Sequence, residues 1–382
     1  MGTISINQEN VGEGTWSPGS SEAVQPEVEF SPEEVIVVDP QIALKKLEAE
    51  KLKALRKALD EINKSKTIKG QTNFYPEFQF EPLKRIKLPF IQVNHALGGG
   101  IPLGRVIEIY GFESSGKSLF CARTVAEFQK AGLRCCWMDM ERCLDPKFYA
   151  DFGVNLDDLI IGTPETAEDC FNTMDILINS GAVDLIIVDS VAAMITKEQK
   201  AKTAEEKTMA SLARIMSGEI PKLLDPCDEN NCTIIFINQV RDNVGVMYGD
   251  SEVTPGGRAL RFYASIRMEL KRKSASVVLD SNGKDPVGHG VNIRVIKNKT
   301  APPGRKGEFM IYYDGREITL KDTLEEAFDV AVNTGLISRP TVQTYLYESG
   351  GFSVSGSRNK FIEKLLEDEL MRNLFVGELT AA

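Results

Sequence analysis

The sequence predicts an α/β fold in which a mostly parallel sheet carries helices on both faces. Between residues 106 and 239, apolar runs typical of buried strands alternate with stretches that have helical spacing. The glycine-rich sequence 111–118 stands between the first strand and the first helix, and a later strand ends in Asp189. Ligands bind at the carboxyl ends of the strands in such sheets, so we expect the functional residues there.

The chain is long enough for a large core domain with smaller additions, because its 382 residues exceed one average domain. No apolar stretch reaches the roughly 18 residues of a membrane span, so we expect no membrane partner. The N-terminus lacks a cationic segment followed by an apolar run, so we expect no secretory signal. The net charge of −10 does not by itself indicate nucleic acid, and any surface that binds it must be local.

The cysteines indicate a reducing compartment, and we expect the protein to be cytoplasmic. The chain has 7 cysteines, none in a C-x-x-C pair, and several fall within predicted strands or helices. We therefore expect them to be small buried residues. The 2 histidines and the lack of metal-ligand spacing argue against a zinc site.

The N-terminal segment 1–40 is predicted to be an acidic disordered tail. It contains no lysine or arginine and is rich in Glu, Gly, Ser and Pro. The apolar residues 35–38 leave a short partner-binding strip as an alternative.

Residues 41–87 are predicted to hold a helix over 43–64 and then a linker. The apolar face of this helix consists of Leu52, Leu55, Leu59 and Ile62. One helix cannot bury this face on itself. It must dock on its own core or on a neighbouring subunit, and the pattern leaves both open.

The segment 111–118 matches the pattern G-x-x-x-x-G-K-[ST], between a strand over 106–110 and a helix over 119–130. Its glycines let backbone N–H groups and the helix N-terminus face one anion-sized hollow. We expect Lys117 to reach the β- and γ-phosphates of a nucleotide and Ser118 to bind Mg²⁺. A chance lysine in a glycine-rich turn is the weaker interpretation. The expected nucleotide-binding residues are Gly111, Glu113, Ser114, Ser115, Gly116, Lys117 and Ser118.

The alternation continues beyond this loop. The further predicted strands are 134–139, 185–189 and 232–239, and the helices are 166–180 and 210–225.

Three polar residues stand at the carboxyl ends of predicted strands. Asp189 follows a run of four apolar residues, as expected for an acid at a strand end that contacts Mg²⁺ or its water shell. Glu141 lies just past the second strand, where it either orients an attacking water or is an ordinary solvated acid. Gln239 ends the last strand, and its neutral amide is suited to sense a γ-phosphate.

The glycine-rich segment 240–258 is either a functional loop or a plain connection. Arg241 and Arg258 supply cations for phosphates, and Val244 or Met247 could wedge between bases.

The core is predicted to span 88–317, and residues 318–382 are predicted to form a small α/β domain. In this domain we expect a helix at 322–333, a strand at 341–347 and a second helix at 361–374.

Nine segments together resemble a RecA-type recombinase, in that family's order, from about residue 88 to residue 313. They are 111–118, 140–146, 180–184, 188–193, 212–217, 236–241, 256–260, 262–265 and 295–299. Other ATPases with this glycine loop lack this set of nine segments. The resemblance implies a RecA-like ATPase core, an N-terminal oligomerisation helix and a small C-terminal α/β domain.

The resemblance also implies roles for individual residues in catalysis. Glu141 matches the catalytic carboxylate, Gln239 matches the γ-phosphate sensor, and Lys117 matches the lysine of the phosphate loop. Lys297 and Lys299 match the pair that reaches the ATP of an adjacent protomer.

Other matched residues fall at binding surfaces. Asp145 and Phe148 fall near the adenine, and Phe262 matches an aromatic residue at the protomer interface. The helix 43–64 resembles one that packs on a neighbour's core, which favours a role between subunits. The positions that match DNA-binding residues are Met209, Arg214, Ser217, Arg241, Val244, Gly256, Gly257 and Arg258.

Some positions depart from the family pattern. Phe112 stands where proline is usual, which leaves the phosphate-binding N–H groups intact. Asp242 and Asn243 stand where apolar and basic residues are common, which weakens the expected grip of this loop on DNA.

The implied function is that of a recombinase that uses ATP and Mg²⁺. Such a protein forms a helical homo-oligomer on single-stranded DNA and exchanges strands with a homologous duplex. A ring helicase with the same core and a non-recombinogenic ATPase that binds single-stranded DNA are the alternatives.

Overall fold

The computed structural model describes residues 49–58, 61, 82–202, 211–242 and 252–381. The chain falls into two compact units, residues 1–81 and 82–382. The predicted tail 1–40 and most of the predicted linker lie outside the described residues, as do Met209 and Val244.

In the first unit, residues 49–58 and 61 are helical, within the predicted helix. Leu52 and Leu55 of its apolar face are 45% and 49% exposed.

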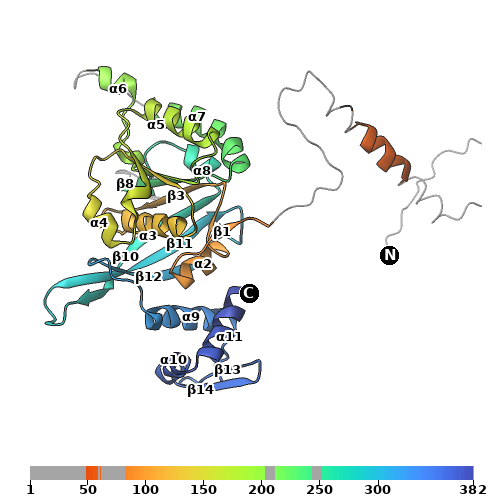
Figure 1. Cartoon of the computed structure of the whole chain (residues 1–382), viewed down its shortest axis with the longest axis vertical. Coiled ribbons are helices and arrows are strands. Elements are labelled where there is room, and N and C mark those ends of the chain that lie inside the picture. The colour runs from red at the N-terminus through yellow and green to blue at the C-terminus, as the bar shows by residue number, and fades with distance from the viewer. Residues whose placement is uncertain (1–48, 59–60, 62–81, 203–210, 243–251, 382) are drawn as a thin grey trace, which may run out of the picture. The chain divides into compact units, whose positions relative to one another are not determined.

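The second unit is built on an eight-stranded sheet with the order β12-β11-β10-β3-β7-β6-β4-β5 (Figure 1). From β10 to β5, neighbouring strands are parallel, while β10–β11 and β11–β12 are antiparallel. The predicted mostly parallel sheet is therefore confirmed, with an antiparallel extension at one side. The strands are β3 (Val106–Gly111), β4 (Cys135–Asp139), β5 (Leu159–Gly162), β6 (Leu185–Asp189), β7 (Thr233–Gln239), β10 (Ile266–Leu279), β11 (Pro286–Asn298) and β12 (Lys306–Tyr312).

Helices cover both faces of this sheet. The helices of the core are α2 (Ile91–Leu97), α3 (Lys117–Lys130), α4 (Pro146–Asp151), α5 (Ala167–Asn179), α6 (Lys197–Ala201), α7 (Ser211–Glu229) and α8 (Ala259–Tyr263). Two short 3-10 helices are η1 (Leu156–Asp158) and η2 (Val191–Ala193), and two short strand pairs are β1 (Arg85–Ile86) with β2 (Ile101–Pro102) and β8 (Arg241–Asp242) with β9 (Glu252–Val253).

Alternating side chains of the buried strands build a core on each side of the sheet. In β6, Leu185 and Ile187 join the cluster under α2, α3 and α4. Ile186 and Val188 join the cluster under α5, α7 and α8. This two-residue period is the pattern expected of a strand buried on both faces.

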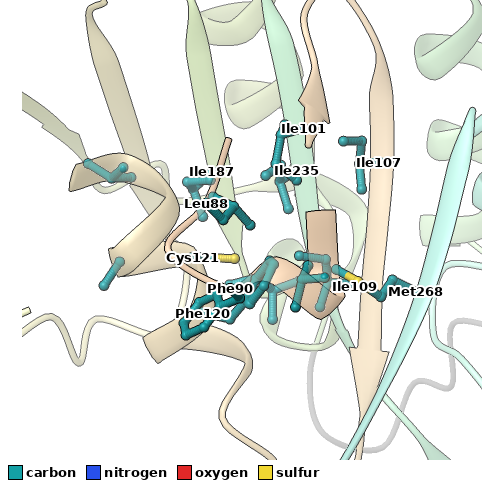
Figure 2. Close-up of a cluster of buried hydrophobic side chains, with 14 of the residues drawn as sticks. Leu88, Phe90, Ile101, Ile107, Ile109, Phe120, Cys121, Ile187, Ile235 and Met268 are labelled. Atoms are coloured by element: carbon teal, nitrogen blue, oxygen red, sulfur yellow. The ribbon is translucent and has the colours of Figure 1, made fainter. Parts of the chain in front are cut away.

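Aromatic rings fill the first of these clusters. Figure 2 shows Phe90 and Phe120 beside isoleucines of the central strands, and the two ring centroids lie 6.1 Å apart. The ring centroid of Phe309 in β12 lies 4.4 Å from that of Phe90. The antiparallel extension therefore shares the core of the parallel strands.

The C-terminal elements lie together in Figure 1. Their buried side chains form a cluster separate from the two clusters of the core. These elements are α9 (Leu320–Thr334), β13 (Tyr345–Ser349), β14 (Phe352–Gly356), α10 (Arg358–Glu367) and α11 (Glu369–Ala381). Helix α9 packs against α2 of the core, where Glu326 accepts a hydrogen bond from the backbone N–H of Gln92.

Several predicted elements differ from the structure. The predicted strand over 341–347 is β13, which starts at Tyr345, and its partner β14 was not predicted. The single helix over 361–374 is wrong. The chain breaks at Asp368, whose carboxylate accepts from the backbone N–H of Met371 and so caps a second helix. Leu370, in this second helix, is 73% exposed.

Two further findings concern the cysteines and the apolar character of the helices. Six cysteines are buried as expected, whereas Cys143 is exposed in the loop after β4. No helix in the described part of the chain is long and apolar enough to cross a bilayer.

Candidate nucleotide and DNA site

The glycine loop connects β3 to α3, and two of its glycines lie against close neighbours. Gly116 has φ of 88°, and a Cβ atom there would lie 2.4 Å from Cδ1 of Ile311. A Cβ atom on Gly111 would lie 2.2 Å from the backbone oxygen of Leu270. The backbone at Leu270 cannot move aside for a side chain at position 111, and the positive φ at position 116 favours glycine, so both positions suit glycine.

The loop folds around the ammonium group of Lys117. Its Nζ donates to the backbone oxygens of Gly111 at 3.0 Å and Phe112 at 2.7 Å, and to Oγ of Ser115 at 3.4 Å. Burial lowers the pKa of Lys117, while the carboxylates of Asp189 and Glu141 raise it. The lysine is thus held at the first turn of α3, where a phosphate group would meet it.

Ser118 and Asp189 face each other beside this lysine. Burial raises the pKa of Asp189 to about 6, and a hydrogen bond from the side chain of Ser118 opposes that rise. A hydroxyl and a carboxylate are the hard oxygen ligands that Mg²⁺ prefers, with waters and phosphate oxygens as the rest. No group of three His, Cys, Asp or Glu in the described ranges could hold a metal alone. The hydroxyl and carboxylate of this pair fit Mg²⁺ by their chemistry.

Glu141 and Gln239 meet directly. Oε1 of Glu141 accepts from Nε2 of Gln239 at 3.3 Å and from the hydroxyl of Ser190. Glu141 is exposed, so one side of its carboxylate remains accessible to water. The carboxylate, the amide and the phosphate loop can therefore act on one reacting group.

Two neighbours that the sequence did not single out organise this edge of the sheet. Ser190 directly follows Asp189 and reaches Glu141 across the sheet edge. Asp139 is buried, and its carboxylate accepts from the backbone N–H groups of Cys143 at 3.3 Å and Leu144 at 3.0 Å. Asp139 thus shapes the loop that carries Glu141. Its place at a strand end, like that of Asp189, was the signal in the sequence.

The phosphate loop opens into a pocket of about 400 Å³. The pocket is lined by Ser114, Ser115, Gly116, Lys117, Ser118, Leu119, Phe148, Arg272, His289 and Tyr313. Phe148 thus lines the same pocket as the phosphate loop, and its contact with a nucleotide stays a prediction. Asp145 instead begins α4, where its carboxylate accepts from the backbone N–H of Lys147 at 3.1 Å. Sequence reasoning missed Arg272, His289 and Tyr313.

Gly256 and Gly257, a glycine pair near the end of the glycine-rich segment 240–258, pack on α7. A Cβ atom on Gly256 would lie 2.2 Å from Sδ of Met216, and one on Gly257 would lie 2.7 Å from Cβ of Ala213. Arg214 is exposed on the same helix. The expected DNA-binding residues of α7 and of this loop therefore occupy adjoining surfaces.

Ser217 and Arg258 are exposed as well, on α7 and just after the glycine pair. Arg241 lies in β8, whose backbone pairs with that of β9. The cations expected to hold the DNA backbone thus flank the glycine pair on both sides in sequence.

Comparison with known proteins assigns the chain to a family. The RecA N-terminal domain family matches residues 53–318. The chain belongs to the RecA family. It is 36% identical to Protein RecA of Teredinibacter turnerae over 322 residues, which cover 84% of this chain and 91% of that protein. It is 39% identical to Protein RecA of Pseudomonas fluorescens over 290 residues, 76% of this chain and 80% of that protein.

A crystal structure of the RadB recombinase is also similar. It has a TM-score of 0.43 and 20% identity, and the match covers 59% of this chain and 94% of that chain. As a RecA family member, the chain is a RecA-type recombinase of the DNA-dependent ATPase class.

In this RecA family member, the two lysines expected to act across protomers differ in environment. Nζ of Lys297 donates to the backbone oxygens of Arg261 at 2.7 Å and Phe262 at 2.8 Å, and so caps the end of α8. Burial is the main cause that lowers its pKa, and the nearby Lys299 adds to the effect. Lys299 is exposed, and the Phe262 ring is 66% exposed.

Proposed function

We propose that this recombinase forms a helical filament on single-stranded DNA and exchanges strands with a homologous duplex. ATP and Mg²⁺ are the proposed ligands of the phosphate loop. In this proposal Gly111–Ser118 and Asp189 come from one protomer, and Lys297 and Lys299 from the next. A head-to-tail contact of this kind gives a helix when it does not close into a ring. The proposed compartment is the cytoplasm, which is consistent with seven free cysteines.

The observation that carries the proposal is the end of β7. There, Gln239 donates to Glu141, whose charge raises the pKa of Lys117 in the phosphate loop against the effect of burial. The preceding residue, Asn238, donates to the backbone oxygen of Pro255 at 3.1 Å, next to the glycine pair on α7. We infer that these two adjacent residues connect the nucleotide site with the glycine-rich segment 240–258 proposed to bind DNA. A small shift of this strand end would move both sites together.

The chain's residues have distinct roles in the proposed cycle. Lys117 and the loop N–H groups hold the phosphates, and Glu141 orients a water or accepts its proton. Gln239 exchanges its bond to Glu141 for one to the γ-phosphate and loses that bond after hydrolysis. Bound Mg²⁺ would be held by Ser118 and Asp189 and would neutralise phosphate charge.

DNA recognition in this proposal needs no contact with specific base edges. Arg214, Arg241 and Arg258 hold the phosphate backbone, and homology is read by base pairing with the incoming duplex. Met209 and Val244 are proposed to lie near the bases. The exposed apolar face of helix 49–58 is proposed to pack on a neighbouring protomer, with Phe262 at the interface between protomers.

The test is joint-molecule formation between a circular single strand and homologous linear duplex, with and without ATP. We expect joint molecules only with ATP and homology, and open helical filaments in electron micrographs. Closed rings would indicate a helicase, and filaments without joint molecules would indicate a non-recombinogenic ATPase. Either result would overturn the proposal.

A further inference from the structure

A carboxylate is buried in the middle of the large sheet. Glu108 lies in β3, shortly before the phosphate loop, and is 0% exposed. Val106 and Phe236, on the same side of the sheet, belong to the apolar cluster under α5, α7 and α8. A charged group in such a layer is costly unless it is paired. The role of Glu108 therefore follows from the groups that pair with it.

One oxygen of this carboxylate pairs with an arginine on the neighbouring strand. Nε of Arg267, opposite Glu108 on β10, donates to Oε2 of Glu108 at 2.5 Å. Arg267 is itself 8% exposed, and its guanidinium carbon lies 4.8 Å from the ring centroid of Tyr110. A buried ion pair with a ring against it holds both charges in one geometry. The carboxylate therefore has a fixed orientation.

The same row of the sheet reaches a lysine expected to act across protomers. Lys297 stands opposite Arg267 on β11, so Glu108, Arg267 and Lys297 occupy one row on three neighbouring strands. Burial is the main cause that lowers the pKa of Lys297, the charge of Arg267 lowers it further, and the charge of Glu108 raises it. Glu108 therefore offsets part of the repulsion between Arg267 and Lys297.

The other carboxylate oxygen pairs with an amide at the end of β7. Nδ2 of Asn238 donates to Oε1 of Glu108 at 3.0 Å and to the backbone oxygen of Pro255 at 3.1 Å. Oδ1 of Asn238 accepts from the backbone N–H of Gln239 at 3.0 Å. An ionised carboxylate and a backbone carbonyl can only accept, so the amide has one orientation. Glu108 thus directs the same amide that holds Pro255.

An apolar residue could fill the place of Glu108 but could not orient these partners. Buried ion pairs add little stability over well-packed apolar residues. They do impose one arrangement on the groups that they hold, because an unpaired buried donor costs free energy. Here the arrangement joins the strand before the phosphate loop, the strand end that carries Gln239, and Pro255 of the glycine-rich segment 240–258.

We propose that Glu108 and Arg267 are positioning residues for the response of DNA binding to ATP. They hold the amide of Asn238, and through it Pro255, in the arrangement that the segment 240–258 needs to bind single-stranded DNA. Neither is among the described residues that line the phosphate-loop pocket. This inference rests on the proposed function and adds to it a pair of residues that the nucleotide does not touch.

The test measures the affinity of the full chain for a labelled single-stranded oligonucleotide by fluorescence anisotropy, with and without Mg²⁺ and ATP. Glu108→Gln keeps the size of the side chain and removes the charge that pairs with Arg267. The gain in DNA affinity on addition of ATP should fall at least about 5-fold. The affinity for DNA without ATP and the affinity for ATP should each change less than about 2-fold. An undiminished gain, or an equal loss of ATP affinity, would overturn the inference.

Glu378→Gln is the matched control. The carboxylate of Glu378 likewise accepts from two side chains, the hydroxyls of Tyr347 and Ser349, but it lies in the C-terminal elements. This variant should keep the wild-type gain in DNA affinity. A loss as large as that in Glu108→Gln would contradict a specific role for Glu108.

A second variant keeps the inference testable if Glu108→Gln fails to fold. Asn238→Ala leaves the ion pair between Glu108 and Arg267 in place, removes the donor to Pro255, and should lose the gain to the same extent. The double variant that combines Glu108→Gln with Arg267→Met should lose no more than the more impaired single variant, because the two residues act as a unit. A retained gain in Asn238→Ala, or losses that add in the double variant, would count against the proposal.

The outcomes separate this inference from the proposed function. If the wild type binds DNA more tightly with ATP and forms joint molecules while Glu108→Gln does both equally well, only the positioning role fails. If the wild type gains no DNA affinity with ATP, the proposed function itself fails, and the positioning role with it.

Discussion

Nε2 of Gln239 lies 3.3 Å from Oε1 of Glu141, across the edge of the sheet between the end of β7 and the loop after β4. Ser190 donates to the same carboxylate oxygen. Two neutral donors therefore orient the carboxylate before any nucleotide arrives. A γ-phosphate that competes for the amide of Gln239 would change both the carboxylate and the strand that leads to the DNA loop.

Replacement of the phosphate-loop lysine should abolish ATP hydrolysis. Lys117→Ala removes the only ammonium group that the described residues place within the loop, and ATPase and strand-exchange rates should fall at least about 100-fold. Lys130→Ala, at the other end of α3, is the matched control and should keep wild-type rates, since Lys130 pairs with Glu127 on the surface. Undiminished turnover in Lys117→Ala would refute the site.

Replacement of Lys299 should leave the folding of the protomer unchanged and reduce the stimulation of ATP hydrolysis by DNA. Its side chain is exposed, so Lys299→Ala should unfold at the wild-type temperature. The stimulation of ATP hydrolysis by single-stranded DNA should fall about 10-fold or more, because the γ-phosphate loses a cation from the adjacent protomer. Lys284→Ala, at an exposed hairpin tip, should show normal stimulation. Normal stimulation in Lys299→Ala as well would rule out a shared site.

The contact between α9 and α2 should make stability depend on pH. Burial raises the pKa of Glu326 from 4.5 to about 8, against the backbone N–H groups of Gln92 and Ile91 that lower it. The folded protein thus keeps a proton that the unfolded chain releases, so this group's contribution to stability is lost as pH rises from about 4.5 to about 8. Glu326→Gln keeps the acceptor oxygen without the charge.

Thermal unfolding at two pH values measures this effect. Glu326→Gln should match the wild type near pH 4, where the carboxyl is protonated in both states, and should exceed it at pH 9 by roughly 2–4 kcal/mol, which raises the melting temperature by several degrees. Glu325→Gln, one residue away and partly exposed, should show no such gain at pH 9. A difference between Glu326→Gln and the wild type that is the same at both pH values would contradict the assignment.

Buried parallel strands such as β6 were predictable because they consist mostly of apolar residues, whereas the short strand β5 was not predicted. Strand β6 has the predicted bounds, and Asp189 closes it as expected. The glycine loop was predictable for a different reason, since its path disfavours side chains at Gly111 and Gly116 and so constrains the sequence itself.

The antiparallel strands and the rest of the pocket could not be predicted from the spacing of apolar residues. Strands β10 and β11 extend beyond the core, mix cations with apolar residues, and shift register between Lys273 and Val277, which breaks the two-residue period. His289 and Tyr313 meet the phosphate loop only through this pairing. Ser190 and Glu141 are likewise 49 residues apart and carry no shared motif.

The most direct test of the central claim is the affinity for a labelled single-stranded oligonucleotide, measured by fluorescence anisotropy with and without Mg²⁺ and ATP. Wild-type protein should bind at least about 10-fold more tightly with ATP. Gln239→Ala should bind nucleotide but lose this gain in DNA affinity, because it lacks the amide at the end of β7 that contacts Glu141. Equal affinity of the wild type with and without ATP, or an undiminished gain in Gln239→Ala, would contradict the account.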